Sequence, residues 1–176
     1  MKTYRPASLQ AVYVKIMTII VGNALSALSR IDKVAREEIK KIPANYHIEM
    51  ITSPQGANFK LKVTDTGLFE LVRNQSRKAD LVIRFKHTSH AFLVFSFQEG
   101  TALAFARDRM VAEGDLNYAT KFVRILNRLE ALILPEFIAR KAVKRYPPEL
   151  GIKEKITKAA QIYARTTTTI ILGRSV

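Results

Sequence analysis

The chain has 176 residues, 48% of them apolar and 25% charged, a composition typical of globular rather than disordered proteins. It holds no cysteine, which excludes disulfide scaffolds, zinc fingers and thiol catalysis. Its 29 basic and 15 acidic residues give a net charge of +14, which favours anionic partners such as phospholipid headgroups or nucleic acid. We expect one domain, long enough to bury a real core.

The positive charge is concentrated toward the two ends of the chain. Residues 1–45 carry 8 basic and 3 acidic residues, and residues 136–176 carry 9 and 3. We expect a helical N-terminal segment (1–45), a core (46–134) and a basic helical C-terminal extension (135–176). The 14 uncharged residues between Lys15 and Arg30 are too few and too polar for a membrane span, so we expect an amphipathic helix and no transmembrane anchor.

The first half of the chain changes from helical to strand periodicity. Apolar spacing predicts a helix from Ser8, loosened at Gly22-Asn23, and a second helix over residues 25–41. From Tyr46 the pattern alternates, with strands expected at 46–52, 58–64, 68–74 and 79–85. The tight polar turns between these strands predict an antiparallel meander.

The second half is mainly helical. Helices are expected over 88–98 and 101–106, followed by a short strand that ends at Gly114. Asp115 then caps a helix with a broad apolar stripe that Pro135 ends. A basic helix and a last amphipathic helix at 152–165 follow. The β-branched tail TTTTIILG makes an extended ending as plausible as a helical one.

The order of elements in residues 57–134 resembles the sterol carrier protein 2 (SCP2) domain. Ala79-Asp80 opens a strand, Gly100 ends the helix that follows, and a strand from Met110 leads through Gly114-Asp115 into the closing helix. The chain departs from the family at Asp108-Arg109, where a Gly-Lys pair is common, and in its longer ends. The resemblance covers roughly half the chain, and its specificity lies in the order of the motifs.

The resemblance implies an α+β fold in which a five-stranded, mainly antiparallel sheet is covered on one side by helices, with an apolar tunnel between. It implies a non-enzymatic carrier of a sterol, acyl or isoprenoid chain, without cofactor, metal or catalytic residue. Some bacterial relatives serve isoprenoid quinone biosynthesis, so an accessory or scaffold protein for that pathway is the alternative. The Pro135–Val176 extension would then bind partner enzymes.

Large apolar side chains from this region can face a common space and bind such a ligand. Any one of them taken alone fits an ordinary core better, and it is their number, with the resemblance, that favours a cavity. The candidate lipid-binding residues are Phe85, Phe92, Leu93, Phe95, Phe97, Leu103, Phe105, Met110, Phe122, Ile125, Leu126 and Leu129. Basic side chains of the C-terminal helices are expected to dock on anionic membranes. These are Arg140, Lys141, Lys144, Arg145, Lys153, Lys155 and Lys158.

Nucleic-acid binding is the rival interpretation of the charge. Against it, the basic face is not interleaved with exposed aromatic residues, and there is no glycine-rich or recognition-helix signature. We therefore expect no nucleic-acid partner. The expected partners are a lipid ligand, an anionic membrane surface and biosynthetic enzymes, with a homodimer left open. The expected location is the cytoplasm, with peripheral attachment to a membrane.

Overall fold

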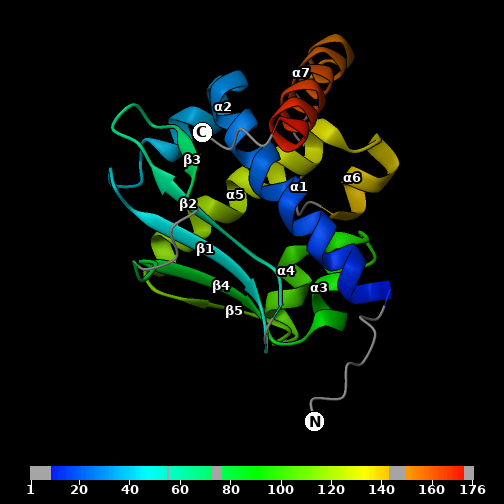
Figure 1. Cartoon of the computed structure of the whole chain (residues 1–176). Helices are drawn as coiled ribbons and strands as arrows, with labels where there is room; N and C mark the ends of the chain where they lie inside the picture. The colour runs from blue at the N-terminus through cyan, green and yellow to red at the C-terminus, as the bar shows by residue number, and fades with distance from the viewer. Residues whose placement is uncertain (1–8, 55, 73–76, 143–149, 173–176) are drawn as a thin grey trace.

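The computed structural model describes residues 9–54, 56–72, 77–142 and 150–172, with the side chains of residues 140–142 outside the description. Within these residues the chain forms an α+β fold of seven helices and a five-stranded sheet (Figure 1). The predicted fold class is confirmed.

The sheet consists of β1 (His47–Thr52), β2 (Asn58–Val63), β3 (Phe69–Leu71), β4 (Leu81–Phe85) and β5 (Met110–Glu113), in the order β3-β2-β1-β4-β5. Three of the four pairings are antiparallel, as expected, but β4 runs parallel to β1.

The predicted simple meander is therefore wrong at its fourth strand. Asp80, just before β4, fixes the parallel pairing at its start. Its backbone N–H donates to the His47 carbonyl, and its carboxylate accepts from the His47 N–H at 2.8 Å. Turn residues predict tight connections between successive strands. They do not predict the longer connection from β3 that places β4 beside β1.

The two faces of the sheet differ as the alternation of side chains requires. The inner face is apolar and buried, with Ile48, Met50 and Ile83 on adjacent strands. On the outer face, ion pairs join Glu49 to Lys60 and Arg84 to Glu113 across neighbouring strands. The apolar face is the one that the helices cover.

The N-terminal helices are α1 (Leu9–Ile31) and α2 (Lys33–Ile39). Helix α1 continues through Gly22-Asn23, where the helix was expected to loosen before a second one, and the chain turns instead at Asp32, whose side chain caps α2. A Cβ on Gly22 would lie 3.0 Å from Cγ of Phe59. Glycine therefore lets α1 lie close to β2 rather than ending the helix.

The next helices are α3 (Thr88–Phe95), α4 (Thr101–Ala106) and α5 (Leu116–Ile133). Gly114 has φ of +133°, and a Cβ there would lie 2.6 Å from the Asp80 carbonyl oxygen, so this turn requires glycine. The Asp115 carboxylate then accepts a hydrogen bond from the Asn117 N–H at 2.7 Å. The predicted turn from β5 into a capped α5 is confirmed.

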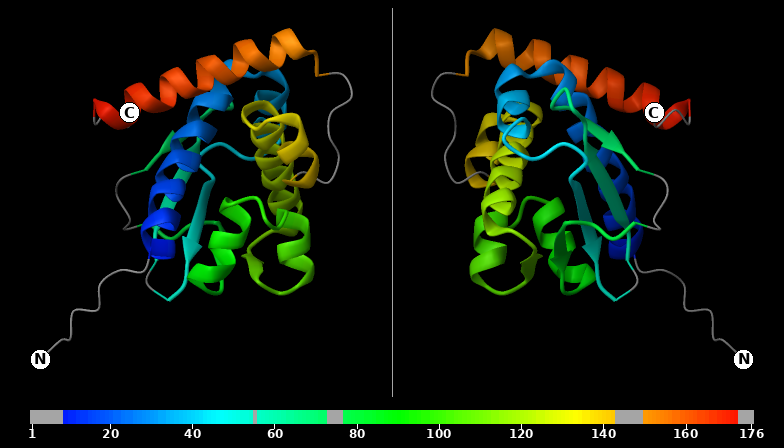
Figure 2. Two further views of the ribbon diagram at one scale, coloured as in Figure 1. Left: turned by 90° about the vertical axis from the view of Figure 1, so that its right-hand side faces the viewer. Right: turned by 90° about the vertical axis from the view of Figure 1, so that its left-hand side faces the viewer.

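The C-terminal helices are α6 (Glu136–Ala142) and α7 (Ile152–Ile171), and α7 lies across one end of the molecule over α1 and α5 (Figure 2). An extended ending was left open, but α7 continues through the threonines. The hydroxyls of Thr168 and Thr169 donate to carbonyls four residues back, and Ile162 is buried in the main core. Packing thus outweighs the β-branched propensity.

In the described part of the chain, α1 alone has the length and apolar character of a membrane-spanning helix. Of its most apolar window, 39% is buried inside the fold. Length and composition alone do not separate a core helix from a membrane span. The buried face of α1 packs on the sheet and on α3, α5 and α7, so α1 is part of the folded core.

Candidate binding cavity

An apolar cavity lies between the inner face of the sheet and helices α1, α3 and α5. Its volume is about 50 Å³. Since a cavity needs roughly 10–15 Å³ to hold one water, the space holds a few atoms of a ligand and not a whole acyl chain. The lining residues are Met17, Ile20, Val21, Ala24, Met50, Phe85, Val94, Phe95, Phe97, Thr101, Leu126, Leu129, Glu130 and Ile133.

Two helices supply most of this lining. Four residues of α1, from Met17 to Ala24, and four of α5, from Leu126 to Ile133, recur at spacings of one, three or four and therefore share a face. Met50 and Phe85 close the cavity from the inner face of β1 and β4. The cavity is thus a space between elements far apart in sequence.

One end of the cavity lies beside a small apolar cluster that includes a residue of α6. Phe97 and Ile133 line the cavity and also pack against this cluster of Leu134 and Ala139. Phe97 has φ of +58°, an uncommon conformation for a bulky residue that costs on the order of 1–3 kcal/mol. Phe97 takes this conformation where α3 ends, because its N–H donates to the Val94 carbonyl and the Gln98 N–H donates to the Leu93 carbonyl, both at 3.0 Å.

Glu130 is the ionisable residue in this lining. Its Oε2 atom is fully enclosed and has no hydrogen-bond partner in the described part of the chain, although the residue as a whole is partly exposed. Burial disfavours the charged form and raises the pKa of Glu130 to about 8. At neutral pH the carboxyl group is therefore mostly protonated and uncharged.

Five of the twelve candidate lipid-binding residues line the cavity: Phe85, Phe95, Phe97, Leu126 and Leu129. The other seven do not. Met110, Phe122 and Ile125 are buried in the core, Leu103 is exposed, and Phe92, Leu93 and Phe105 are half-buried. Phe92 packs edge-on against the Tyr13 ring, with the ring centroids 5.3 Å apart. Helical spacing predicts which residues turn inward but not which of them border an unfilled space.

The basic candidates are placed only in part. Arg140 and Lys141 lie in α6, with side chains outside the description, and Lys144 and Arg145 lie outside the described residues. Lys153 is exposed and Lys155 half-buried on α7. Lys158 is engaged in an ion-pair cluster, so it is not a free surface cation.

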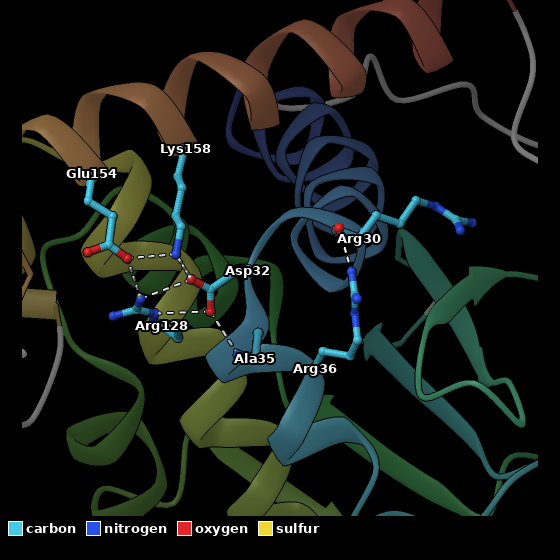
Figure 3. Close-up of polar contacts among 7 residues, drawn as sticks. All are labelled: Arg30, Asp32, Ala35, Arg36, Arg128, Glu154 and Lys158. Carbon is cyan, nitrogen blue, oxygen red and sulfur yellow. Dashed lines mark hydrogen bonds and ion pairs between the residues drawn. The ribbon is translucent and has the colours of Figure 1, made fainter.

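That cluster is centred on Asp32, whose side chain is 0% exposed (Figure 3). Its carboxylate accepts from the Ala35 N–H at 2.7 Å, from Arg128 of α5 at 2.9 and 3.2 Å, and from Lys158 of α7 at 2.8 Å. Glu154 in turn accepts from Lys158 at 2.6 Å. The cluster joins the α1–α2 junction to α5 and α7.

The charge of Asp32 is held in place by its partners. Burial alone would raise its pKa, but the hydrogen bonds from Arg128 and Lys158 outweigh burial, and the pKa of Asp32 is lowered. Arg128 directly precedes the cavity residues Leu129 and Glu130. The Tyr163 hydroxyl of α7 also donates to the Ile133 carbonyl at 2.9 Å. These contacts fix the end of α5 that lines the cavity.

The four lining residues of α1 and Glu130 were not predicted from the sequence, and neither were Met50, Val94, Thr101 and Ile133. Helix α1 is apolar on more than one side, so periodicity could not identify the side that faces the cavity. Glu130 did carry a signal. It lies four residues after Leu126 and three before Ile133, inside the apolar stripe of α5, where a charged residue is out of place.

The comparisons with known proteins concern the fold. No protein-family model and no curated protein matches the chain. Among solved structures, it is similar to the sterol carrier protein domain 2 of Helicoverpa armigera, with 14% identity and a TM-score of 0.44 over 73% of this chain and 94% of that one. It is similar to apo sterol carrier protein 2 from Yarrowia lipolytica, with 16% identity and a TM-score of 0.41 over 79% and 98%.

A third similar structure is described as "UbiJ-SCP2 Ubiquinone synthesis protein", with 13% identity and a TM-score of 0.44 over 67% of this chain and 95% of that one. The descriptions of these three structures name SCP2 or sterol carrier protein 2, the family that the order of motifs in residues 57–134 resembles.

Proposed function

We propose that this protein is a non-enzymatic lipid carrier. It holds the apolar part of a sterol, acyl or isoprenoid lipid between α1, α3, α5 and the sheet, and all of its 176 residues act as one lipid-binding domain. The observation that carries the proposal is the cavity, which is apolar on nearly all sides. Apolar surface transferred from water into such a site contributes about 25 cal/mol per Å². A long hydrocarbon chain therefore supplies enough apolar area to bind without a charged anchor.

Uptake of a whole chain requires the cavity to widen. We expect this to cost least at the end beside α6, since the apolar cluster there is small and is linked to the main core through Ile133. The backbone between α5 and α6 is extended at Leu134 and continues into Pro135, which leaves a short link between the two helices. We propose that α6 moves outward as the ligand enters.

Membrane docking is the second part of the proposal, and an exposed stripe on α1 supports it. The stripe consists of Leu9, Val12, Ile16 and Ile19, all exposed and spaced by three or four residues. A helix with such a face lies in the membrane interface with its apolar side among the acyl chains, and positive charge adds attraction to anionic lipid. The neighbouring face of α1 lines the cavity, so docking would bring lipid close to the site.

Ile16→Glu is expected to lower co-sedimentation with vesicles of phosphatidylcholine and phosphatidylglycerol about tenfold, because it loses the burial of an isoleucine side chain in the membrane. Val34→Glu on α2 is the matched control, since Val34 is 58% exposed and Ile16 52%. The control should bind like the wild type. Equal loss in both variants, or binding indifferent to anionic lipid and to salt, would count against docking through α1.

Ala24→Leu is expected to reduce lipid uptake strongly, because the larger side chain fills space that the ligand must occupy. Uptake of cholesterol and of hexadecan-1-ol from vesicles is measured by native mass spectrometry of the re-isolated protein. Ala160→Leu on the exposed surface of α7 is the control and should take up lipid normally. Circular dichroism checks that both variants fold. Full uptake by a folded Ala24→Leu variant would show that the lipid does not bind in this cavity.

A further inference from the structure

We propose that Glu130 recognises the head group of the bound lipid, and that the cavity takes a long-chain lipid ending in an uncharged oxygen group, a hydroxyl or a carbonyl. This inference rests on the proposed carrier function and assigns the ligand class of the same cavity. It also assigns a role to the ionisable side chain in a mainly apolar lining.

The geometry requires a partner for Glu130. Its Oε2 is enclosed at the cavity wall and has no partner among the described residues. A buried polar group without a hydrogen bond is destabilising, and a ligand oxygen entering the cavity would provide the bond. Glu130 lies one turn from Leu126 and Ile133, both of which also line the cavity, so the ligand oxygen would lie among their apolar side chains.

The charges of the site select the ligand. None of the described lining residues is basic, so an anionic head such as a fatty-acid carboxylate would be buried without a cation. A cationic head would need an ionised Glu130 as its partner, so that two charges would lose their water in an apolar space. A hydroxyl or carbonyl adds no charge.

The protonation state suits such a head. The raised pKa of Glu130 keeps its carboxyl group neutral at pH 7, so that it has one O–H donor and a free acceptor oxygen. It can donate to a carbonyl, or both donate to and accept from a hydroxyl. Thr101, in the first turn of α4, adds a side-chain hydroxyl to the lining.

The test compares four ligands with the same chain length on the intact protein: hexadecan-1-ol, n-hexadecane, hexadecanoate and hexadecylamine. Native mass spectrometry at pH 7 gives their relative affinities. The alcohol should bind about tenfold more tightly than the hydrocarbon, and hexadecanoate and hexadecylamine more weakly than the alcohol. Tighter binding of the carboxylate or the amine would overturn the inference.

Two variants assign the preference to Glu130. Glu130→Gln keeps a donor and an acceptor and should keep most of the preference for the alcohol. Glu130→Leu should bring the ratio of alcohol to hydrocarbon to about one, because an apolar side chain treats both ligands alike. Glu37→Leu, on the exposed face of α2, is the control and should leave the wild-type ratio. An unchanged ratio in Glu130→Leu would overturn the inference.

Failure of the inference and failure of the carrier function give different results. If the wild type binds alcohol and hydrocarbon equally well, the head-group role is wrong and the carrier stands. If no chain of any kind enters, the carrier function itself is wrong. If the Glu130 variants do not fold, infrared spectroscopy of the wild type still tests the contact. The infrared carbonyl band of the protonated carboxyl should shift when hexadecan-1-ol binds and stay in place with n-hexadecane; no shift with the alcohol would contradict the contact.

Discussion

Replacing Asp32 with alanine is expected to lower the free energy of unfolding by about 3–5 kcal/mol, because it leaves two largely buried cations without their shared partner. The side chains of Arg128 and Lys158 are 13% and 20% exposed, so water replaces the lost carboxylate only in part. The variant also loses the cap of α2 at the Ala35 N–H. Urea unfolding at pH 7 measures the change.

The control for Asp32 is Glu37→Ala, which removes an exposed carboxylate paired with Lys40 within α2 and should leave stability nearly unchanged. Because the folded-state pKa of Asp32 is lowered, its contribution is present above its ordinary pKa of 3.8 and is lost as the pH falls through the folded value. The difference between wild type and variant should therefore shrink in acid. If the unfolding free energies of the wild type and Asp32→Ala differ by less than about 1 kcal/mol at pH 7, the ion-pair cluster does not stabilise the fold.

Replacing Glu130 with glutamine is expected to stabilise the protein at neutral pH by about 3 kcal/mol, because the folded state no longer has to hold a proton there. The ordinary pKa of the carboxyl is 4.5, and burial raises it to about 8 in the folded state. The folded state thus binds more protons than the unfolded state between these values. The unfolding free energy of the wild type should fall as the pH rises from 4.5 to 8.

The measurement is urea unfolding of both proteins at several values from pH 4.5 to pH 8. The gain from Glu130→Gln should be close to zero at the acid end and largest at pH 8. Glu113→Gln, which removes an exposed partner of Arg84, should show no such rise. A gain that does not depend on pH would mean that Glu130 is hydrated or paired in solution. A stabilising replacement in the cavity wall would fit a residue retained for binding rather than for folding.

Much of the fold could be predicted because local rules and tertiary contacts agree there. The change of period at Tyr46 marks the first strand, and Gly114-Asp115 marks the turn into α5. The prediction failed where a distant contact decides the conformation. Gly22 lets α1 lie close to Phe59 of β2 and does not loosen the helix. Asp80 accepts a hydrogen bond from the His47 N–H and so holds the start of β4 beside β1.

The cavity was predictable as a region and not as a set of residues. Phe95 and Phe122 look alike in sequence, yet one borders the cavity and the other is sealed in the core against Phe69. The distinction depends on how completely neighbouring elements fill the space, which no local pattern encodes. Lys158 illustrates the same limit for charge, since its partner Asp32 lies far away in sequence.

Photolabelling can show whether a lipid chain enters the cavity between α1 and α5. A long-chain alcohol carrying a diazirine at mid-chain is bound to the protein, irradiated, and located by peptide mass spectrometry. We expect labels on lining residues such as Met17, Met50 and Leu129, and their loss in Ala24→Leu. Labels confined to exposed residues of α7, unchanged in Ala24→Leu, would contradict it.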